Sequence, residues 1–205
     1  DKQGWTPLLI ASNAGHVGIV DRLLLGGAAV EVGDVTGGKT PLMGACMNGH
    51  VGVAEALLRG GASVSSQKAD GLTALHFACL GGSLACIRVL CDSGANVGAR
   101  NNSGRTPLHA ACMQGHADAV RTLLDRGVDV NCTNTNGATA LHYASHNGHM
   151  ECVEALCDAG ADYNAAITDG RTALDVAMEK GHEAVVAALL ARVFVGAGEA
   201  GYNPA

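Results

Sequence analysis

The sequence predicts an all-α fold, a solenoid of stacked helix-turn-helix units joined by β-turn or hairpin fingers. The first observation is a Gly-x-Thr-Pro/Ala-Leu motif at intervals of 34, 33, 33, 33 and 33 residues, which begins at Gly4, Gly38, Gly71, Gly104, Gly137 and Gly170. The second is a Gly-His dipeptide that follows in five copies and is replaced by Gly82-Ser83 in the third. The third is size, because 33 residues fall below the roughly 40 that a chain usually needs to fold alone. The copies must therefore stack on one another.

The first helix of each copy is expected at the Thr-Pro/Ala-Leu motif. In the fourth copy the hydroxyl of Thr106 can cap a helix N-terminus, and Pro107 already has a helical φ angle. Residues 110–112 continue the helix. Gly115 can end it, because glycine adopts the left-handed backbone conformation without a Cβ penalty.

A second helix follows the Gly-His dipeptide. Val120, Leu123 and Leu124 recur at helical spacing with charged residues on the opposite side, so this helix is amphipathic. It closes at Gly127, and a polar turn at 129–136 leads to the next copy.

These residues resemble a known repeat family. The string Thr106-Pro107-Leu108-His109-Ala110-Ala111, followed by Gly115-His116, Leu123-Leu124, Gly127 and Asp129-Val130-Asn131, closely resembles the ankyrin repeat. The resemblance covers nearly all of the chain. It implies an ankyrin solenoid whose first helices and turn tips form a concave groove for a protein partner. It also implies that His76, His109 and His142 tie each turn to the following helix by hydrogen bonds.

The repeat boundaries follow from the motif. We expect repeats at 1–34, 35–67, 68–100, 101–133, 134–166 and 167–194, the last as a C-terminal cap, with a Gly-rich tail at 195–205. The first repeat has consensus-like apolar helices instead of the polar outer face that a terminal cap needs. Further ankyrin repeats or a covering segment are therefore expected N-terminal to Asp1.

Composition narrows the function classes. The formal net charge is −6, with 13 Lys and Arg against 19 Asp and Glu, so bulk charge does not favour nucleic acid or acidic lipid. The longest apolar runs are far below the roughly 18 to 20 residues that a membrane-spanning helix requires. We expect no nucleic-acid partner and no membrane span.

Eight cysteines and nine histidines invite a metal or thiol interpretation, but their repeat positions favour a structural one. Seven cysteines replace small or apolar residues at interior positions, and only Cys132 lies in a turn. Equivalent cysteines in neighbouring repeats should lie too far apart for disulfides, so we expect a reducing compartment, cytoplasmic or nuclear. Ligand spacing predicts no metal site, and the absence of catalytic motifs predicts no enzyme and no cofactor.

Two turn asparagines carry alternative interpretations. Asn131 and Asn164 resemble ankyrin residues that asparaginyl hydroxylases modify. The simpler interpretation is that their side chains satisfy backbone groups of the turns.

The candidate site consists of positions that differ between copies and point outward. Met47, Leu72, Leu80 and Met113 would form an apolar strip over repeats two to four. Methionine, arginine and tryptophan suit a protein interface. The alternative is that the four apolar residues only pack against neighbouring turns. The full set of expected partner-binding residues is Trp5, Lys39, Met47, Asn48, Leu72, Leu80, Arg105, Met113, Gln114, His146 and Arg171.

The sequence therefore predicts a non-catalytic scaffold or adaptor that binds a partner protein or peptide through the concave groove. Two alternatives stay open. The chain could be the regulatory or targeting ankyrin domain of a larger enzyme or channel, or a structural subunit of a large assembly.

Overall fold

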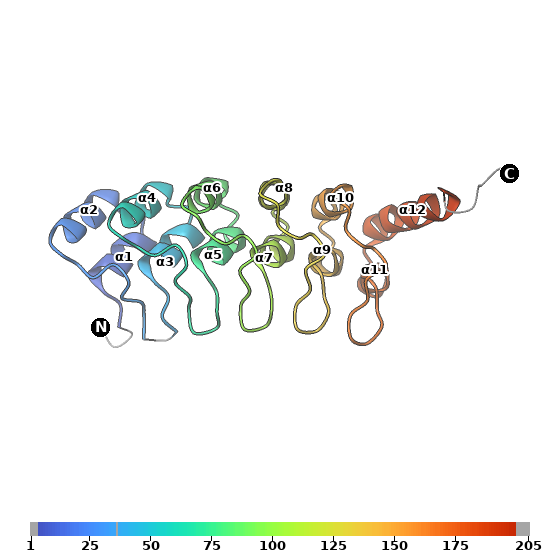
Figure 1. The fold of residues 1–205 in the computed structure, drawn as a ribbon, viewed down its shortest axis with the longest axis horizontal. Coiled ribbons are helices and arrows are strands. Elements are labelled where there is room, and N and C mark those ends of the chain that lie inside the picture. Colours follow the sequence, from blue (N-terminus) through green and yellow to red (C-terminus); the bar gives the residue numbers. More distant parts are fainter. Residues whose placement is uncertain (1–3, 36, 200–205) are drawn as a thin grey trace.

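The computed structural model describes residues 4–35 and 37–199, which form helix pairs stacked in two layers (Figure 1). The inner layer contains the first helix of each repeat, namely α1 (Pro7–Asn13), α3 (Pro41–Met47), α5 (Ala74–Leu80), α7 (Pro107–Gln114), α9 (Ala140–Asn147) and α11 (Ala173–Lys180). The outer layer contains the second helix, namely α2 (Val17–Leu25), α4 (Val51–Arg59), α6 (Leu84–Asp92), α8 (Ala117–Asp125), α10 (Met150–Asp158) and α12 (Glu183–Glu199). Within each layer, every helix packs on the next one along the chain.

The inner helices begin and end as the motif predicts. The Oγ1 atom of Thr6 accepts a hydrogen bond from the backbone N–H of Leu9 at 3.1 Å, which satisfies one of the free donors at the start of α1. The glycines that end α7, α9 and α11 are left-handed, with φ angles of 78°, 72° and 73°. The local sequence therefore fixes both ends of these short helices.

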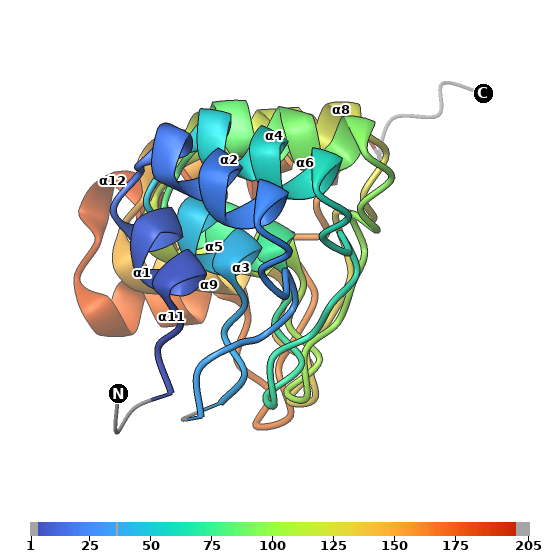
Figure 2. The same cartoon turned by 90° about the vertical axis from the view of Figure 1, so that its left-hand side faces the viewer.

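The turns between repeats form fingers that project from one edge of the helical layers (Figures 1 and 2). Three of them contain an antiparallel bridge, at Gln67–Thr73, Thr133–Thr139 and Ala166–Thr172. Each finger from the third repeat to the sixth also donates a backbone hydrogen bond to the preceding one, for example from Asn102 N–H to the Asp70 carbonyl at 2.9 Å. The turns therefore line up as a continuous wall beside the inner helices.

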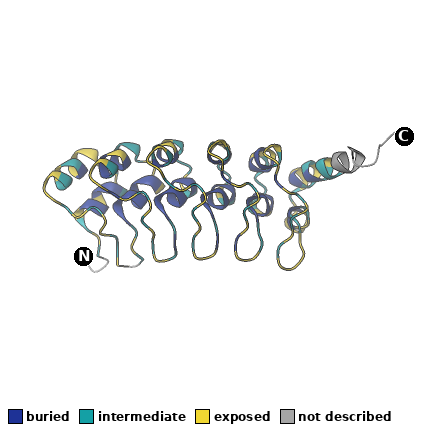
Figure 3. Ribbon diagram, in the orientation of Figure 1, coloured by how far each residue is buried: buried dark blue, intermediate teal, exposed yellow. Residues whose placement is uncertain are grey.

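The core lies between the two layers (Figure 3). Leucines at one position of successive outer helices are completely buried, and each contributes about 1.5–3 kcal/mol of burial free energy. They are Leu57, Leu90, Leu123, Leu156 and Leu189. Because this core runs without a break from repeat to repeat, each repeat depends on its neighbours.

The Gly-His dipeptide locks adjacent repeats together. The Nε2 atoms of His50, His116, His149 and His182 lie 2.9–3.3 Å from backbone carbonyls of the preceding repeat and donate to them. A Cβ atom at Gly82 would lie 2.6 Å from the His116 ring, and the φ of Gly82 is +68°. This position requires glycine both for its backbone conformation and for contact with the next histidine.

The last outer helix is longer than the sequence suggests. The expected boundary between the sixth repeat and the tail is residue 194, whereas α12 continues to Glu199, and residues 200–205 lie outside the described residues. Glycines with positive φ follow the other outer helices, at Gly27, Gly61, Gly94, Gly127 and Gly160. Val193 occupies the equivalent position, and a β-branched residue strongly disfavours positive φ. No helix in the described part of the chain is long and apolar enough to cross a membrane.

The outer end of the first repeat is exposed. Ile19 is 51% exposed, whereas Val53, Cys86, Ala119, Cys152 and Val185 at the same repeat position are at most 1% exposed. Ile10 and Val17 are exposed on the same two helices. This end has the apolar surface of an internal repeat.

Candidate functional site

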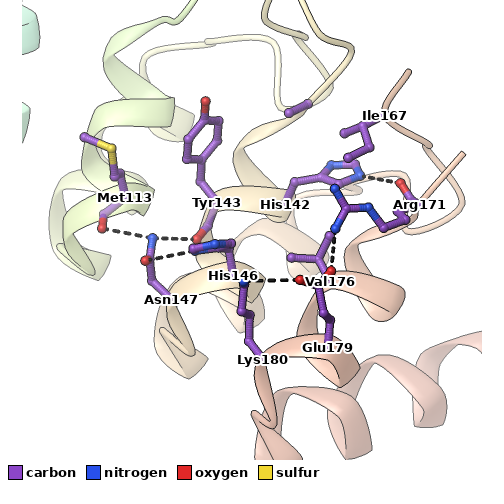
Figure 4. A pocket seen from close by; sticks show the side chains of 11 residues that line it. Met113, His142, Tyr143, His146, Asn147, Ile167, Arg171, Val176, Glu179 and Lys180 are labelled. Carbon is purple, nitrogen blue, oxygen red and sulfur yellow. Dashed lines mark hydrogen bonds and ion pairs between the residues drawn. The ribbon is translucent and has the colours of Figure 1, made fainter. Parts of the chain in front are cut away.

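Two neighbouring cavities open along the inner helices and the fingers. The larger, of about 450 Å³, extends across α7, α9 and α11 (Figure 4), and it is lined by Met113, Ala138, His142, Tyr143, His146, Asn147, Ile167, Arg171, Val176, Glu179 and Lys180. The smaller, of about 270 Å³, lies between α5 and α7 and is lined by Asp70, Leu72, His76, Leu80, Asn101, Asn102, Ser103, Arg105, His109, Ala110 and Met113. Met113 lines both cavities. Together they form the groove.

Small side chains at repeating positions open these cavities. The sixth residue after the motif glycine faces the groove, and it is Phe77 in the third repeat but Ala110 in the fourth. The small Ala110 leaves space for the cavity beside α7. Tyr143 occupies the same position in the fifth repeat and lines the larger cavity together with the small Ala138.

Arg105 lies between the two cavities. It lines the smaller one, and its guanidinium carbon lies 5.3 Å from the centroid of the Tyr143 ring. This distance is typical of a cation–π contact. The Nε atom of Arg105 is buried and has no hydrogen-bond partner in the described part of the chain.

The C-terminal side of the groove carries paired charges. Arg171 bonds Asp169 at 2.7 Å. It also pairs with Glu179, while Lys180 lies 3.3 Å from another oxygen of Glu179 (Figure 4). The hydrogen bonds from Lys180 and then Arg171 lower the pKa of Glu179, and the hydrogen bonds from Arg171 lower that of Asp169. Asp169 and Glu179 are therefore charged at neutral pH, and the four groups are paired with one another.

A third cluster lies on the N-terminal side of the groove. The Nζ atom of Lys39 is 3.9 Å from the sulfur of Met47 and 5.5 Å from the centroid of the Phe77 ring. Burial lowers the pKa of Lys39, and the charge of Asp34 opposes that effect. This lysine therefore lies over apolar groups with its charge partly removed from water.

The structure divides the sequence-predicted residues into two groups. Leu72, Leu80, Arg105 and Met113 share the smaller cavity, and Met113, His146 and Arg171 share the larger one. Leu72 and Leu80 also pack against the core, so both interpretations of these two residues apply: they line the cavity and they pack against their neighbours. The others lie outside both cavities, namely Trp5, Lys39, Met47, Asn48 and Gln114.

Sequence reasoning missed several groove residues. Tyr143, Asn147, Ile167 and Val176 line the larger cavity but are absent from the expected set. Asn147 donates to the Met113 carbonyl at 3.2 Å and so joins α9 to α7 (Figure 4). Variation in size at the position of Phe77, Ala110 and Tyr143 was the signal that could have identified this wall.

A model of a known protein family matches the chain. The family is described as ankyrin repeats in three copies, and it matches residues 1–68, 60–134 and 126–197. The chain belongs to the ankyrin repeat family. Ankyrin repeats are generally protein–protein interaction modules. A comparison with curated proteins found no match.

The histidines of the ankyrin motif hold the scaffold together. In the fourth repeat, Nδ1 of His109 accepts from the N–H and Oγ1 of Thr106 at 3.1 and 2.9 Å, and Nε2 donates to the Ala138 carbonyl at 3.0 Å. His76 and His142 make the same set of contacts. The expected link between turn and helix is confirmed.

The eight cysteines, all in the described part of the chain, are free thiols. Cys46 and Cys86 interact across a repeat boundary, and this contact, followed by burial, raises the pKa of Cys46. Cys112 and Cys152 repeat the arrangement two repeats further on, with burial as the main cause of the raised pKa of Cys112. Neither pair joins equivalent repeat positions, so an alignment of the repeats does not reveal these pairs.

Asn131 acts as a link between turns. Its Oδ1 atom accepts from the N–H of Asp162 at 2.8 Å, and its own backbone N–H donates to the Asp129 carboxylate at 2.9 Å. Asn164 donates its N–H to the carboxylate of Asp162 in the same way. The contact with Asp162 matches the interpretation that the Asn131 side chain satisfies a turn backbone group, and the same interpretation of the Asn164 side chain stays a prediction. Within the described residues, no three of His, Cys, Asp and Glu lie close enough together to hold a metal ion.

Proposed function

We propose that this ankyrin domain is a non-catalytic interaction module that binds one extended segment of a partner protein along the groove. The observation that supports the proposal is the pair of joined cavities, which share Met113 and combine apolar walls with polar groups at their rims. Apolar surface at the centre of a polar rim is typical of protein interfaces. A further cavity, of about 460 Å³, lies beside the outer helices α10 and α12 and is lined by Cys157, Gly160, Ala161, Tyr163, Ala191 and Arg192, but it involves the last two repeats alone.

The test is a selection of displayed random 12-residue peptides on the wild-type chain, followed by fluorescence polarisation with the enriched peptides. Met113→Asp should weaken binding at least about tenfold, because it places a charge where both cavities meet. Met178→Asp is the matched control, since Met178 is 59% exposed on α11 and lines neither cavity. Far-UV circular dichroism should be the same for both variants. Equal affinity of wild type and Met113→Asp for every enriched peptide would contradict the proposal.

A second candidate role is as one section of a longer stack. The exposed Ile10, Val17 and Ile19 at the outer end of the first repeat support this role, because the position of Ile19 is buried in every later repeat, each of which packs on the repeat before it. In this role the groove would serve a larger enzyme, channel or assembly.

The cysteines support a proposal for the compartment. All eight are free thiols, and five of them are buried. Free thiols in such number are typical of a reducing environment, so we propose a cytoplasmic or nuclear protein.

A further inference from the structure

We propose that the bound segment carries an aspartate or glutamate that pairs with Arg105, and an apolar side chain nearby that enters the larger cavity. This inference rests on the proposed function and specifies the chemistry of the partner. It is drawn from the state of Arg105 and from the shape of the groove on each side of it.

Arg105 has a positive charge that the chain itself does not neutralise. It forms no ion pair within the described residues, and its buried Nε atom has no hydrogen-bond partner. The cations that line the larger cavity have acidic partners, since Arg171 bonds Asp169 at 2.7 Å and Lys180 lies 3.3 Å from Glu179. A partly desolvated arginine favours a carboxylate, which can accept two parallel hydrogen bonds from it.

The Tyr143 ring holds this charge in place. The Arg105 guanidinium lies over the ring, and Asn134 donates to the Tyr143 hydroxyl at 3.0 Å. Because the hydrogen bond to its hydroxyl orients the ring, and the ring in turn positions the guanidinium, Arg105 would lose less conformational entropy on binding a carboxylate. The arginine is therefore preorganised toward the smaller cavity, which it lines.

The acids near Arg105 do not compete for it. Asp70 lines the same cavity, but its carboxylate is bonded by Lys68 and by the N–H of Leu72. Burial alone would raise the pKa of Asp70, yet these bonds outweigh burial and lower it. The other titratable groups of this cavity are His76 and His109, whose neutral rings are committed to the scaffold.

An apolar side chain fits the larger cavity on the other side of Tyr143. Its walls include Met113, Ile167 and Val176. Neighbouring repeats are about 10 Å apart, which corresponds to about three residues of extended chain. The acidic and apolar residues of the partner should therefore lie within about three positions of each other.

An internal acidic side chain fits better than a C-terminal carboxylate. The groove continues past Arg105 in both directions, toward Leu72 and Leu80 on one side and toward Val176 on the other. A segment can therefore cross Arg105 without ending there.

The experiment reverses the charge at position 105 and uses peptide selection to measure how the preferred partner sequence changes. Displayed random 12-residue peptides are selected in parallel on the wild type and on Arg105→Glu, and enriched peptides are measured by fluorescence polarisation. The wild type should enrich Asp or Glu within about three residues of Leu, Ile, Val or Met. Arg105→Glu should enrich Lys or Arg at that position, keep the apolar residue, and bind the wild-type peptides at least about tenfold more weakly.

Two variants control for charge and packing. Arg88→Glu makes the same charge change at an exposed position of α6 in the outer layer, and it should leave affinity unchanged. Arg105→Met keeps an unbranched side chain over Tyr143, so it should lose the preference for acid without reversing it. Thermal melts of each variant separate loss of binding from loss of fold.

The outcomes distinguish this inference from the proposed function. Peptides that bind wild type and Arg105→Glu equally but lose affinity for Met113→Asp would overturn the acidic pairing and leave the groove intact. Peptides unaffected by either change would overturn both. A wild-type selection without Asp or Glu, or binding that requires a free C-terminus and is lost on amidation, would also overturn the inference.

Discussion

The His109 side chain joins two repeats through one imidazole ring. Its Nδ1 atom accepts hydrogen bonds from Thr106, so protonation at Nδ1 would remove the acceptor on which the start of α7 depends. Burial is the main cause that lowers the pKa of His109 to about 4, and it lowers the pKa values of His76 and His142 as well. The neutral ring is therefore part of the folded structure.

The free energy of unfolding should fall in mild acid. Between pH 6.5 and pH 4 the unfolded chain binds protons that native His109 does not, so stability present above pH 6.5 is lost as the pH falls toward 4. For His109 alone the loss is about 3 kcal/mol, given an unfolded pKa of about 6.5. Urea unfolding at a series of pH values measures it. His109→Met, which places the residue of the second repeat at this position, should reduce the slope, and an unchanged slope would contradict this origin.

Some single positions could be interpreted from the sequence and others could not. The repeat motif indicated that His76, His109 and His142 belong to the scaffold, because the same residue type recurs in one place. It did not identify Tyr143 or Val176, because a cavity depends on the difference in volume between copies. The volume differences at Phe77, Ala110 and Tyr143 become visible as groove walls only when neighbouring helices are packed together.

At the level of helices, the repeat periodicity predicted the paired layers, whereas the end of α12 depends on the residue at one position. An outer helix ends where glycine adopts positive φ, and Val193 stands where Gly160 ends the previous repeat. In residues 191–198 the apolar side chains favour a continued helix, whereas the glycines favour its end. Without the glycine at this one position, the helix continued.

Equivalent positions on α2 and α4 should respond differently to charge. Ile19→Lys places an ammonium group on an exposed surface and should change the free energy of unfolding by less than about 0.5 kcal/mol. Val53→Lys buries the same group at 0% exposure and should cost several kcal/mol, on the order of 3 to 5. Denaturant unfolding of the two variants measures the difference.

Ile19→Lys also tests the uncovered end of the stack. Sedimentation at high protein concentration should show less self-association in this variant, because the apolar end surface is smaller. A cost at Ile19 equal to that at Val53 would show that the first repeat is covered.

Across the whole molecule, each repeat should stabilise only the repeats directly next to it. The contacts of the inner and outer layers follow the order of the chain, as expected of a repeat solenoid. A repeat at the end has one neighbour, whereas a central repeat has two. The same substitution should therefore have different consequences at the two places.

Leu123 in α8 and Leu189 in α12 occupy the same repeat position, and both are completely buried. Replacing either with alanine removes the same side chain and costs about 2 to 5 kcal/mol locally. Leu189→Ala should reduce amide hydrogen-exchange protection mainly in α11 and α12, because the remaining repeats keep their mutual contacts. Leu123→Ala should reduce protection on both sides of α8, because it weakens two interfaces at once. Equal loss along the whole chain for both variants would mean that the solenoid unfolds as one cooperative unit.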